Sequence, residues 1–184
     1  MTYRKVYKVI VFFGFMKTKH EVVYGGLGCG KSTYAFSIIN PEETCKLGVG
    51  SSLRDVLIFK FGSKGRHEAE TTSFGIEPRT TSLRSIVCDI SQIENPIFLL
   101  DEWTTFFSYS VLWPSKKIIT RANDILDAVE ENPNIERGVY IALDYIPYMP
   151  FNLYKKKALW NKILFERATD ITRVDYGKPR KVFP

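Results

Sequence analysis

The stretch that decides the fold is Tyr24–Thr33, YGGLGCGKST, which follows an apolar, β-branched lead-in. Gly25, Gly30, Lys31 and Ser32 satisfy the pattern G-x-x-x-x-G-K-[ST]. Glycines let backbone amides turn inward around a phosphate group, and a following helix adds a favourable dipole at its amino terminus. We therefore expect a phosphate-binding loop, with a strand before it and a helix that opens at the Gly30-Lys31-Ser32 step.

The lysine and the first hydroxyl of such a loop have separate tasks. Lys31 is expected to bridge the β- and γ-phosphates of ATP, and the Ser32 hydroxyl to ligate Mg²⁺. The alternative is a glycine-rich turn with a solvated lysine, which the predicted strand and helix context disfavours. The residues expected to bind the nucleotide are Gly25, Gly26, Leu27, Gly28, Cys29, Gly30, Lys31, Ser32 and Thr33.

A second stretch, IFLLDEW, supplies the acidic half of the predicted site. The apolar run Ile97–Leu100 delivers Asp101 and Glu102 to the carboxyl end of a strand, the edge of the sheet where the loop also lies. Asp101 is expected to hold magnesium, directly or through water, and Glu102 to take a proton from the attacking hydroxyl or water. A strand-to-helix turn with a capping aspartate is the alternative.

Length and composition favour one α/β domain that spans the whole chain. The 184 residues are 45% hydrophobic, enough for a single core. The longest apolar run, Val9–Met16, is too short to cross a bilayer, so we expect no membrane segment. Cys29, Cys45 and Cys88 form no CxxC pair, which fits the cytoplasm and disfavours structural zinc. The net charge of +6 agrees with a polyanionic ligand but does not decide on one.

Hydrophobic patterning predicts strands that alternate with helices. Such alternation is typical of a mainly parallel sheet with its site at the carboxyl ends of the strands. The expected strands are Lys5–Phe15, Glu21–Tyr24, Val56–Phe61, Ser85–Ile90, Ile97–Leu100, Gly138–Leu143 and, last, Asp170–Tyr176. The expected helices run from Gly30 to near Pro41, across the periodic residues 118–129 before Pro133, and over Leu153–Arg167.

The order of four segments resembles the type II thymidine kinase family. These segments are VVYGGLGCGKSTYAFSI, VLIFKFGSKGRHEAETTSFGIE, IFLLDEWTTFF and GVYIALDYIPYMPF, and the similarity spans roughly Val22 to Val174. The resemblance implies a P-loop NTPase of the RecA-like, additional-strand class, a three-layer α/β sandwich. It also implies ATP- and Mg²⁺-dependent phosphoryl transfer to a deoxynucleoside. Many NTPases share the loop and the acidic pair, so only the other segments distinguish the thymidine kinase family from them.

The resemblance also assigns roles to individual residues. It makes Glu102 the general base and Arg66 an arginine that stabilises phosphate charge. A solvated surface arginine is the equally good alternative for Arg66. It places Ser73 and Gly75 in a turn near the nucleoside, Phe106 and Phe107 beside the base, and Asp144 and Tyr148 in the late motif. Packing in the core is the alternative for the two phenylalanines, and capping a turn is the alternative for Asp144.

The chain departs from that family in two ways. Ile146-Pro147 stands where the late motif has D-F, which weakens the case for thymine recognition. No cysteine follows Cys88, so we expect the zinc-bound lid of the family to be missing or replaced. An open site admits water and favours hydrolysis over transfer.

A nucleic-acid motor, such as a viral DNA-packaging or plasmid-transfer ATPase, is the alternative function. Lys116, Lys117, Arg121 and the run Lys155–Lys157 would line a DNA channel, and Arg121 or Arg137 would reach a neighbouring subunit's ATP. Solvated helix faces explain the same charges. The amino-terminal arm, residues 1–20, is predicted to add an apolar edge strand that a partner subunit covers, hence a homo-oligomer.

Overall fold

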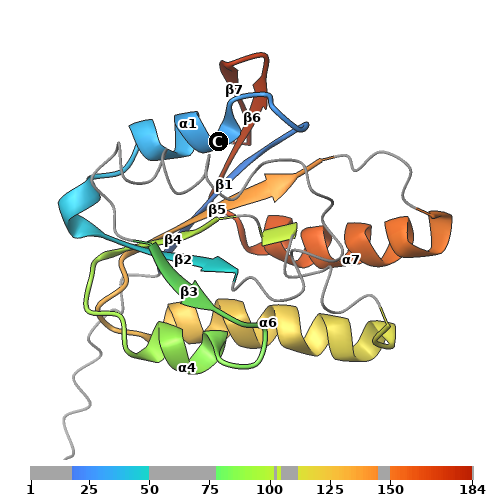
Figure 1. The fold of residues 1–184 in the computed structure, drawn as a ribbon, viewed down its shortest axis with the longest axis horizontal. Helices are drawn as coiled ribbons and strands as arrows, with labels where there is room; N and C mark the ends of the chain where they lie inside the picture. Colours follow the sequence, from blue (N-terminus) through green and yellow to red (C-terminus); the bar gives the residue numbers. More distant parts are fainter. Residues whose placement is uncertain (1–17, 50–77, 102, 105–111, 145–149, 184) are drawn as a thin grey trace, which may run out of the picture.

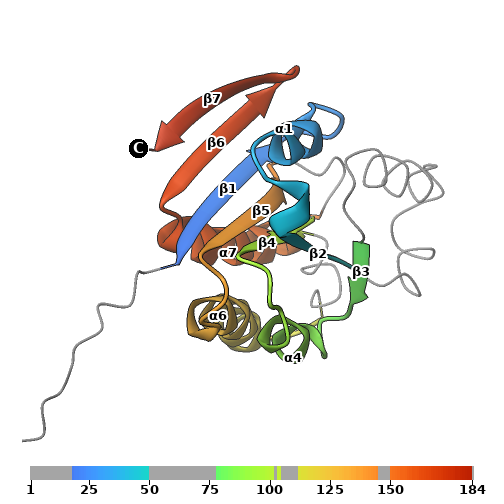
Figure 2. The same cartoon turned by 90° about the vertical axis from the view of Figure 1, so that its left-hand side faces the viewer.

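The computed structural model describes residues 18–49, 78–101, 103–104, 112–144 and 150–183. These residues form one seven-stranded sheet in the order β3-β2-β4-β5-β1-β6-β7 (Figures 1 and 2). All neighbouring strands run parallel except β6 and β7. The strands are β1 (Lys19–Gly25), β2 (Thr44–Val49), β3 (Pro78–Thr81), β4 (Ile97–Leu100), β5 (Arg137–Leu143), β6 (Asp170–Asp175) and β7 (Lys178–Phe183).

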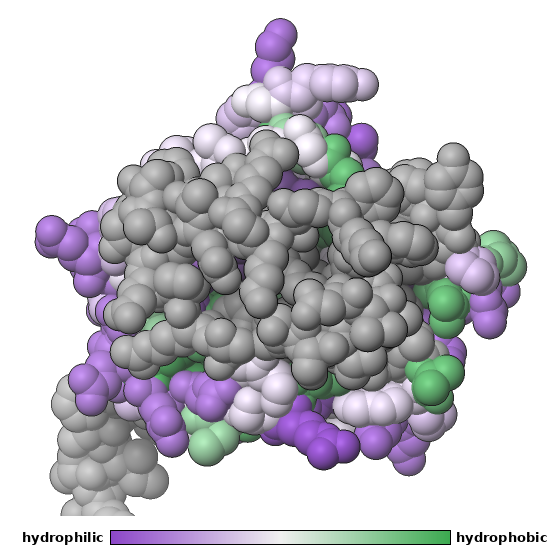
Figure 3. Space-filling view, in the orientation of Figure 1, coloured by the Kyte–Doolittle hydropathy of each residue, from purple (hydrophilic) through white to green (hydrophobic). Residues whose placement is uncertain are grey.

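Helices cover both faces of this sheet, which makes three layers (Figure 2). One face carries α1 (Lys31–Ser37), and the other carries α4 (Ile86–Ser91), α6 (Ser115–Glu131) and α7 (Phe151–Arg167) (Figure 1). A 3-10 turn, Pro41–Glu43, leads from α1 into β2. In the orientation of Figure 1, hydrophobic side chains on the right-hand side of Figure 3 gather over the amino ends of α6 and α7.

The two cores follow from the alternation of side chains along each strand. Val23 and Ile141 point to the α1 side, where they pack with Phe36. Val22 and Tyr140 point to the other side, into the larger core under α4, α6 and α7. Because both faces are covered, β4 and β5 are apolar at nearly every position, as expected for central parallel strands.

Strand β5 lies between β1 and β4, which confirms the additional-strand arrangement. Gly25 at the end of β1 is in register with Leu143 at the end of β5. Leu100, at the end of β4, is in register with Tyr140 of β5. Since these strands are parallel, the glycine loop after β1 and the acidic residues after β4 leave the sheet at the same edge.

Most predicted elements among the described residues are confirmed. The strands predicted at 21–24, 97–100 and 138–143 are β1, β4 and β5, and the helices at 118–129 and 153–167 are α6 and α7. The helix after Gly30 also forms, although it ends at Ser37. The strands predicted at 5–15 and 56–61 lie outside the described residues. No helix in the described part of the chain is long and apolar enough to span a membrane.

The strand predicted over Ser85–Ile90 is wrong, because this segment contains the helix α4. Its buried residues, Ile86 and Ile90, are four apart, which is helical spacing. Ser82 and Ser85 exchange hydrogen bonds at 3.1 Å before the first turn, each backbone N–H donating to the hydroxyl of the other residue. These bonds form a turn ahead of the helix, which competes with an extended chain at this point.

Three strands were missed or misjudged. Hydrophobic patterning predicts neither β2 nor β3, and it marks Asp170–Tyr176 as the last strand. Strand β6 ends at Asp175, and a turn at Tyr176 and Gly177 leads into β7. The residues of β7 from Lys178 to Val182 are all exposed, so the strand lacks the apolar alternation that marks a strand in a sequence.

Candidate functional site

The loop between β1 and α1 turns back on itself around a buried lysine. Gly28 and Gly30 have φ of 68° and 88°, which ordinary side chains disfavour. The N–H of Tyr34 donates to the Gly30 carbonyl at 3.0 Å and closes the first helical turn. Lys31 is 7% exposed, and its ammonium donates to the Gly26 carbonyl inside the loop at 3.2 Å. The loop thus concentrates a cation and backbone dipoles at the end of β1.

The position of Gly25 admits no side chain. A Cβ built there would lie 2.6 Å from Cys29 Sγ and closer still to the carbonyl oxygen of Val174 in β6. At the neighbouring Gly26 a Cβ would meet nothing within 4 Å. The first glycine of the motif is therefore required by the contact between loop and β6, since its own φ is not positive.

The β6–β7 turn packs directly on the loop. The N–H of Gly177 donates to the Cys29 carbonyl at 2.7 Å. A Cβ on Gly30 would lie 3.3 Å from the Gly177 Cα. Sequence reasoning missed this contact, because β7 lacks the apolar alternation that would mark the second strand of a hairpin.

At the end of β4, Asp101 forms a buried ion pair with a lysine from β2, the neighbouring strand in the sheet. The Lys46 Nζ lies 2.9 Å from Asp101 Oδ2, with side chains 4% and 8% exposed. The Asp101 N–H donates to the Leu47 carbonyl at 3.3 Å. Lys46 also lies over the Phe36 ring, 5.0 Å from its centroid. A lysine inside an apolar strand was the available signal for this partner, and sequence reasoning missed it.

The chain just beyond Asp101 is held on both sides of Glu102, which itself lies outside the described residues. The rings of Trp103 and Trp160 stack with centroids 4.6 Å apart. The Trp160 indole N–H donates to the Trp103 carbonyl at 2.9 Å, and the reciprocal bond is 3.4 Å. The Leu143 N–H donates to the Thr104 hydroxyl at 2.9 Å. These bonds anchor the segment to α7 and β5.

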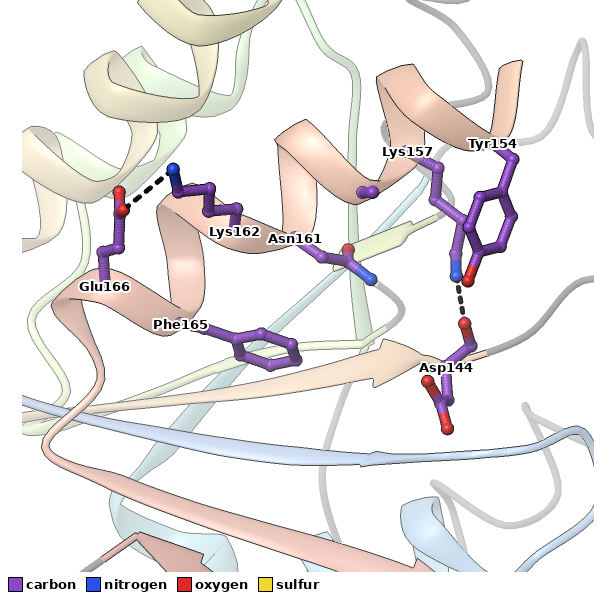
Figure 4. Close-up of a pocket in the computed structure, with 8 residues that line it drawn as sticks. Asp144, Tyr154, Lys157, Asn161, Lys162, Phe165 and Glu166 are labelled. Carbon is purple, nitrogen blue, oxygen red and sulfur yellow. Dashed lines mark hydrogen bonds and ion pairs between the residues drawn. The ribbon is translucent and has the colours of Figure 1, made fainter. Parts of the chain in front are cut away.

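Asp144, at the end of β5, adjoins the loop and opens onto a cavity. Its N–H donates to the Gly25 carbonyl at 3.1 Å. Its carboxylate lies 3.7 Å from a guanidinium nitrogen of Arg173. Figure 4 shows Lys157 of α7 pointing at Asp144, with Tyr154 beside it, and all three residues line a cavity of about 410 Å³. The Lys157 ammonium donates to the Asp144 carbonyl, and burial lowers the pKa of Lys157, although Asp144 partly opposes this.

The structure brings together part of the predicted site. The loop, Lys31, Ser32, Asp101 and Asp144 share one edge of the sheet. The remaining predicted site residues lie outside the described part of the chain: Arg66, Ser73, Gly75, Glu102, Phe106, Phe107 and Tyr148.

Three basic residues assigned to the motor have other roles in the fold. Lys157 is 2% exposed, so the expectation that it lines a channel is wrong. Arg121 donates to the Leu83 and Arg84 carbonyls, which binds α6 to the start of α4. Arg137 lies at the amino end of β5, where it pairs with Glu21 at 2.6 Å. In this arrangement neither arginine is available to reach the ATP of a neighbouring subunit.

Comparison with known proteins gives a likeness of fold. No protein-family model and no curated protein matches the sequence. A solved structure of a Pyrococcus horikoshii OT3 protein is similar with a TM-score of 0.52 and 10% identity, over 92% of this chain and 87% of that one. The P4 protein of bacteriophage phi6, solved in complex with ADP, gives a TM-score of 0.47 and 11% identity. That alignment covers 91% of this chain and about half, 54%, of P4. The strand order, the loop and the acidic strand end together give this chain the fold of the nucleotide-binding P-loop NTPases.

Proposed function

We propose that the chain is a magnesium-dependent nucleoside triphosphatase that binds ATP at the Gly25–Thr33 loop. The observation that carries this proposal is the buried Lys31 ammonium, held inside a glycine loop at the edge where Asp101 ends β4. A buried cation among inward-turned amides suits a polyphosphate. Because its present partner is a neutral carbonyl, Lys31 gains a stronger, charge-assisted interaction when a phosphate enters.

The donor set fits magnesium. The Ser32 hydroxyl and the Asp101 carboxylate are hard oxygen ligands, which Mg²⁺ prefers together with phosphate oxygens and water. Lys46 neutralises Asp101 in the structure, so a cation already occupies one side of this carboxylate. When bound, the metal neutralises charge that develops on the phosphates. We infer that Lys46 holds the Asp101 carboxylate in place between turnovers.

Glu102 remains the proposed base. Its neighbours Asp101 and Trp103 are both buried, and bonds to Leu47 and Trp160 fix them. In hydrolysis, Glu102 takes a proton from water while the water oxygen attacks the γ-phosphorus and the bond to the ADP oxygen breaks. The thymidine kinase resemblance implies transfer to a deoxynucleoside instead. That reaction would use the same ATP- and magnesium-binding residues, with a hydroxyl of the deoxynucleoside attacking in place of water.

A second candidate, coupling to nucleic acid, is favoured by the surface at the amino ends of α6 and α7. These ends leave the sheet at the same edge as the loop, since the helices follow β4 and β5. Lys117 lies 4.2 Å from the Trp113 ring centroid, and Lys155 lies 4.6 Å from that of Phe151. Phe151 is 72% exposed and Leu112 is 92% exposed. Lysines among exposed apolar and aromatic side chains suit the backbone and bases of a single strand.

One turnover experiment separates these activities. Phosphate release from ATP is measured with and without Mg²⁺. The measurement is repeated with each of a panel of deoxynucleosides, and with DNA at two salt concentrations. We expect magnesium-dependent hydrolysis without any acceptor, lost in Lys31→Ala and retained in Lys19→Ala at the opposite end of β1. A nucleoside monophosphate formed in step with ADP would identify a kinase. DNA stimulation that salt weakens, lost in Lys117→Ala, would identify the coupled ATPase. Absence of turnover in the wild-type chain contradicts the proposal.

A further inference from the structure

The β6–β7 turn presents an aromatic ring beside the phosphate loop. Tyr176 is 97% exposed, and it has a φ of 51°. With Gly177 at 76°, both turn residues have positive φ, a conformation in which Asn-Gly is common and a bulky ring is disfavoured. An exposed aromatic residue in a disfavoured conformation contributes nothing to the core, so its placement calls for another reason.

The backbone of the turn that carries this ring is fixed relative to the loop. Gly177, the next residue, donates its N–H to the Cys29 carbonyl at 2.7 Å. Two residues before Tyr176, the Val174 carbonyl abuts Gly25. Arg173 braces the base of the hairpin, because its Nε lies 2.9 Å from an Asp175 carboxylate oxygen and its guanidinium lies over the Tyr24 ring. The turn is therefore joined to the loop on both sides of Tyr176.

We propose that Tyr176 binds the nucleoside end of the nucleotide by stacking against its base. This inference rests on the proposed binding of a triphosphate in the loop. When the loop encloses the phosphates, the ribose and base extend beyond it, and an exposed ring next to the loop offers a flat apolar surface. The exposed Leu27, two residues from the Cys29 that holds the turn, adds apolar surface on the loop itself. Stacking accepts every base, so the site takes nucleotides with little discrimination between their bases.

The test compares nucleotides with inorganic tripolyphosphate, which has no base. Affinities of the full chain for Mg²⁺-ATPγS, Mg²⁺-GTPγS and Mg²⁺-tripolyphosphate are measured by calorimetry in the wild type, Tyr176→Asn and Tyr176→Phe. Asparagine suits the positive φ, so it keeps the turn while it removes the ring. Val182→Asn is the matched control, since it removes an exposed apolar side chain from β7 of the same hairpin.

We expect Tyr176→Asn to weaken both nucleotides by about fivefold or more and to leave tripolyphosphate unchanged. Tyr176→Phe and Val182→Asn should bind as the wild type does. Equal nucleotide affinity in Tyr176→Asn and the wild type overturns the stacking role alone, and so does an equal loss for tripolyphosphate, which would indicate a disturbed loop. If the wild type binds neither nucleotide nor tripolyphosphate, the proposed function and this inference both fail.

Discussion

Gly25→Ala and Gly26→Ala form a matched pair that tests whether the loop depends on its contact with β6. Both substitutions add one methyl group to adjacent glycines of the same motif. At Gly25 the methyl group would lie 2.6 Å from Cys29 Sγ and closer still to the Val174 carbonyl. The sulfur can rotate away, whereas the carbonyl belongs to a strand paired with β1, so the strand itself must move.

The expected effects on stability have opposite signs. Overpacking of this kind costs about 1–3 kcal/mol of the free energy of unfolding. At Gly26 a Cβ meets nothing within 4 Å and the φ is not positive, so alanine restricts the unfolded chain and stabilises by about 0.4–1 kcal/mol. The variants should differ by about 1.4–4 kcal/mol, which is roughly 3–16 °C in melting temperature for a chain of this size.

Thermal unfolding followed by circular dichroism, with and without Mg²⁺-ATPγS, measures both consequences. We expect Gly25→Ala to melt lower and to lose the shift that the nucleotide produces, because the displaced strand carries the turn that holds the Cys29 carbonyl. Gly26→Ala should melt at or above the wild-type temperature. Equal melting temperatures in the two variants would refute the reasoning from close packing.

Three further predictions concern the surroundings of the site. Lys46→Met leaves the buried Asp101 carboxylate without its lysine, so urea unfolding should show a loss of about 3–5 kcal/mol that Mg²⁺-ATP partly restores; no restoration would argue against Asp101 as a metal ligand. Trp160→Phe removes the indole donor to the Trp103 carbonyl and should cost about 1–3 kcal/mol in the same assay, with an unchanged midpoint as the contrary result. Burial, with Glu130 adding to it, raises the pKa of Tyr140 above 10.0, so the unfolded chain releases this proton first and stability falls as pH rises past 10. Tyr140→Phe should reduce that fall by up to about 1.4 kcal/mol per pH unit, and an identical slope would contradict the assignment.

The elements that could be predicted are those whose signal is local. The residues of the phosphate loop are consecutive in the chain, so their pattern can be recognised without knowledge of the fold. The amphipathic helix α6 was predicted because Ile118, Ala122, Ile125 and Val129 repeat at helical spacing and all are buried. The apolar run of β4 likewise marked a strand that is covered on both faces.

The remaining features depend on contacts between distant segments. A short apolar run does not distinguish a strand from a buried helix, and the segment Ile86–Ser91 was misjudged for this reason. The pairing of Lys46 with Asp101 exists only because β2 lies beside β4. Strand β7, KPRKVF, has the lysines and the proline of an exposed edge strand, which hide it from hydrophobic patterning. The contact of Gly177 with Cys29 could not be foreseen without that strand.

The central claim is that the buried Lys31 ammonium and the Asp101 carboxylate hold one magnesium–triphosphate group. Calorimetric titration of Mg²⁺-ATPγS into the wild type and Lys31→Ala, with and without magnesium, tests it most directly. We expect one binding site per chain in the wild type that requires Mg²⁺, and loss of that binding in a Lys31→Ala variant that still unfolds cooperatively. Binding that survives both Lys31→Ala and the removal of magnesium would contradict it.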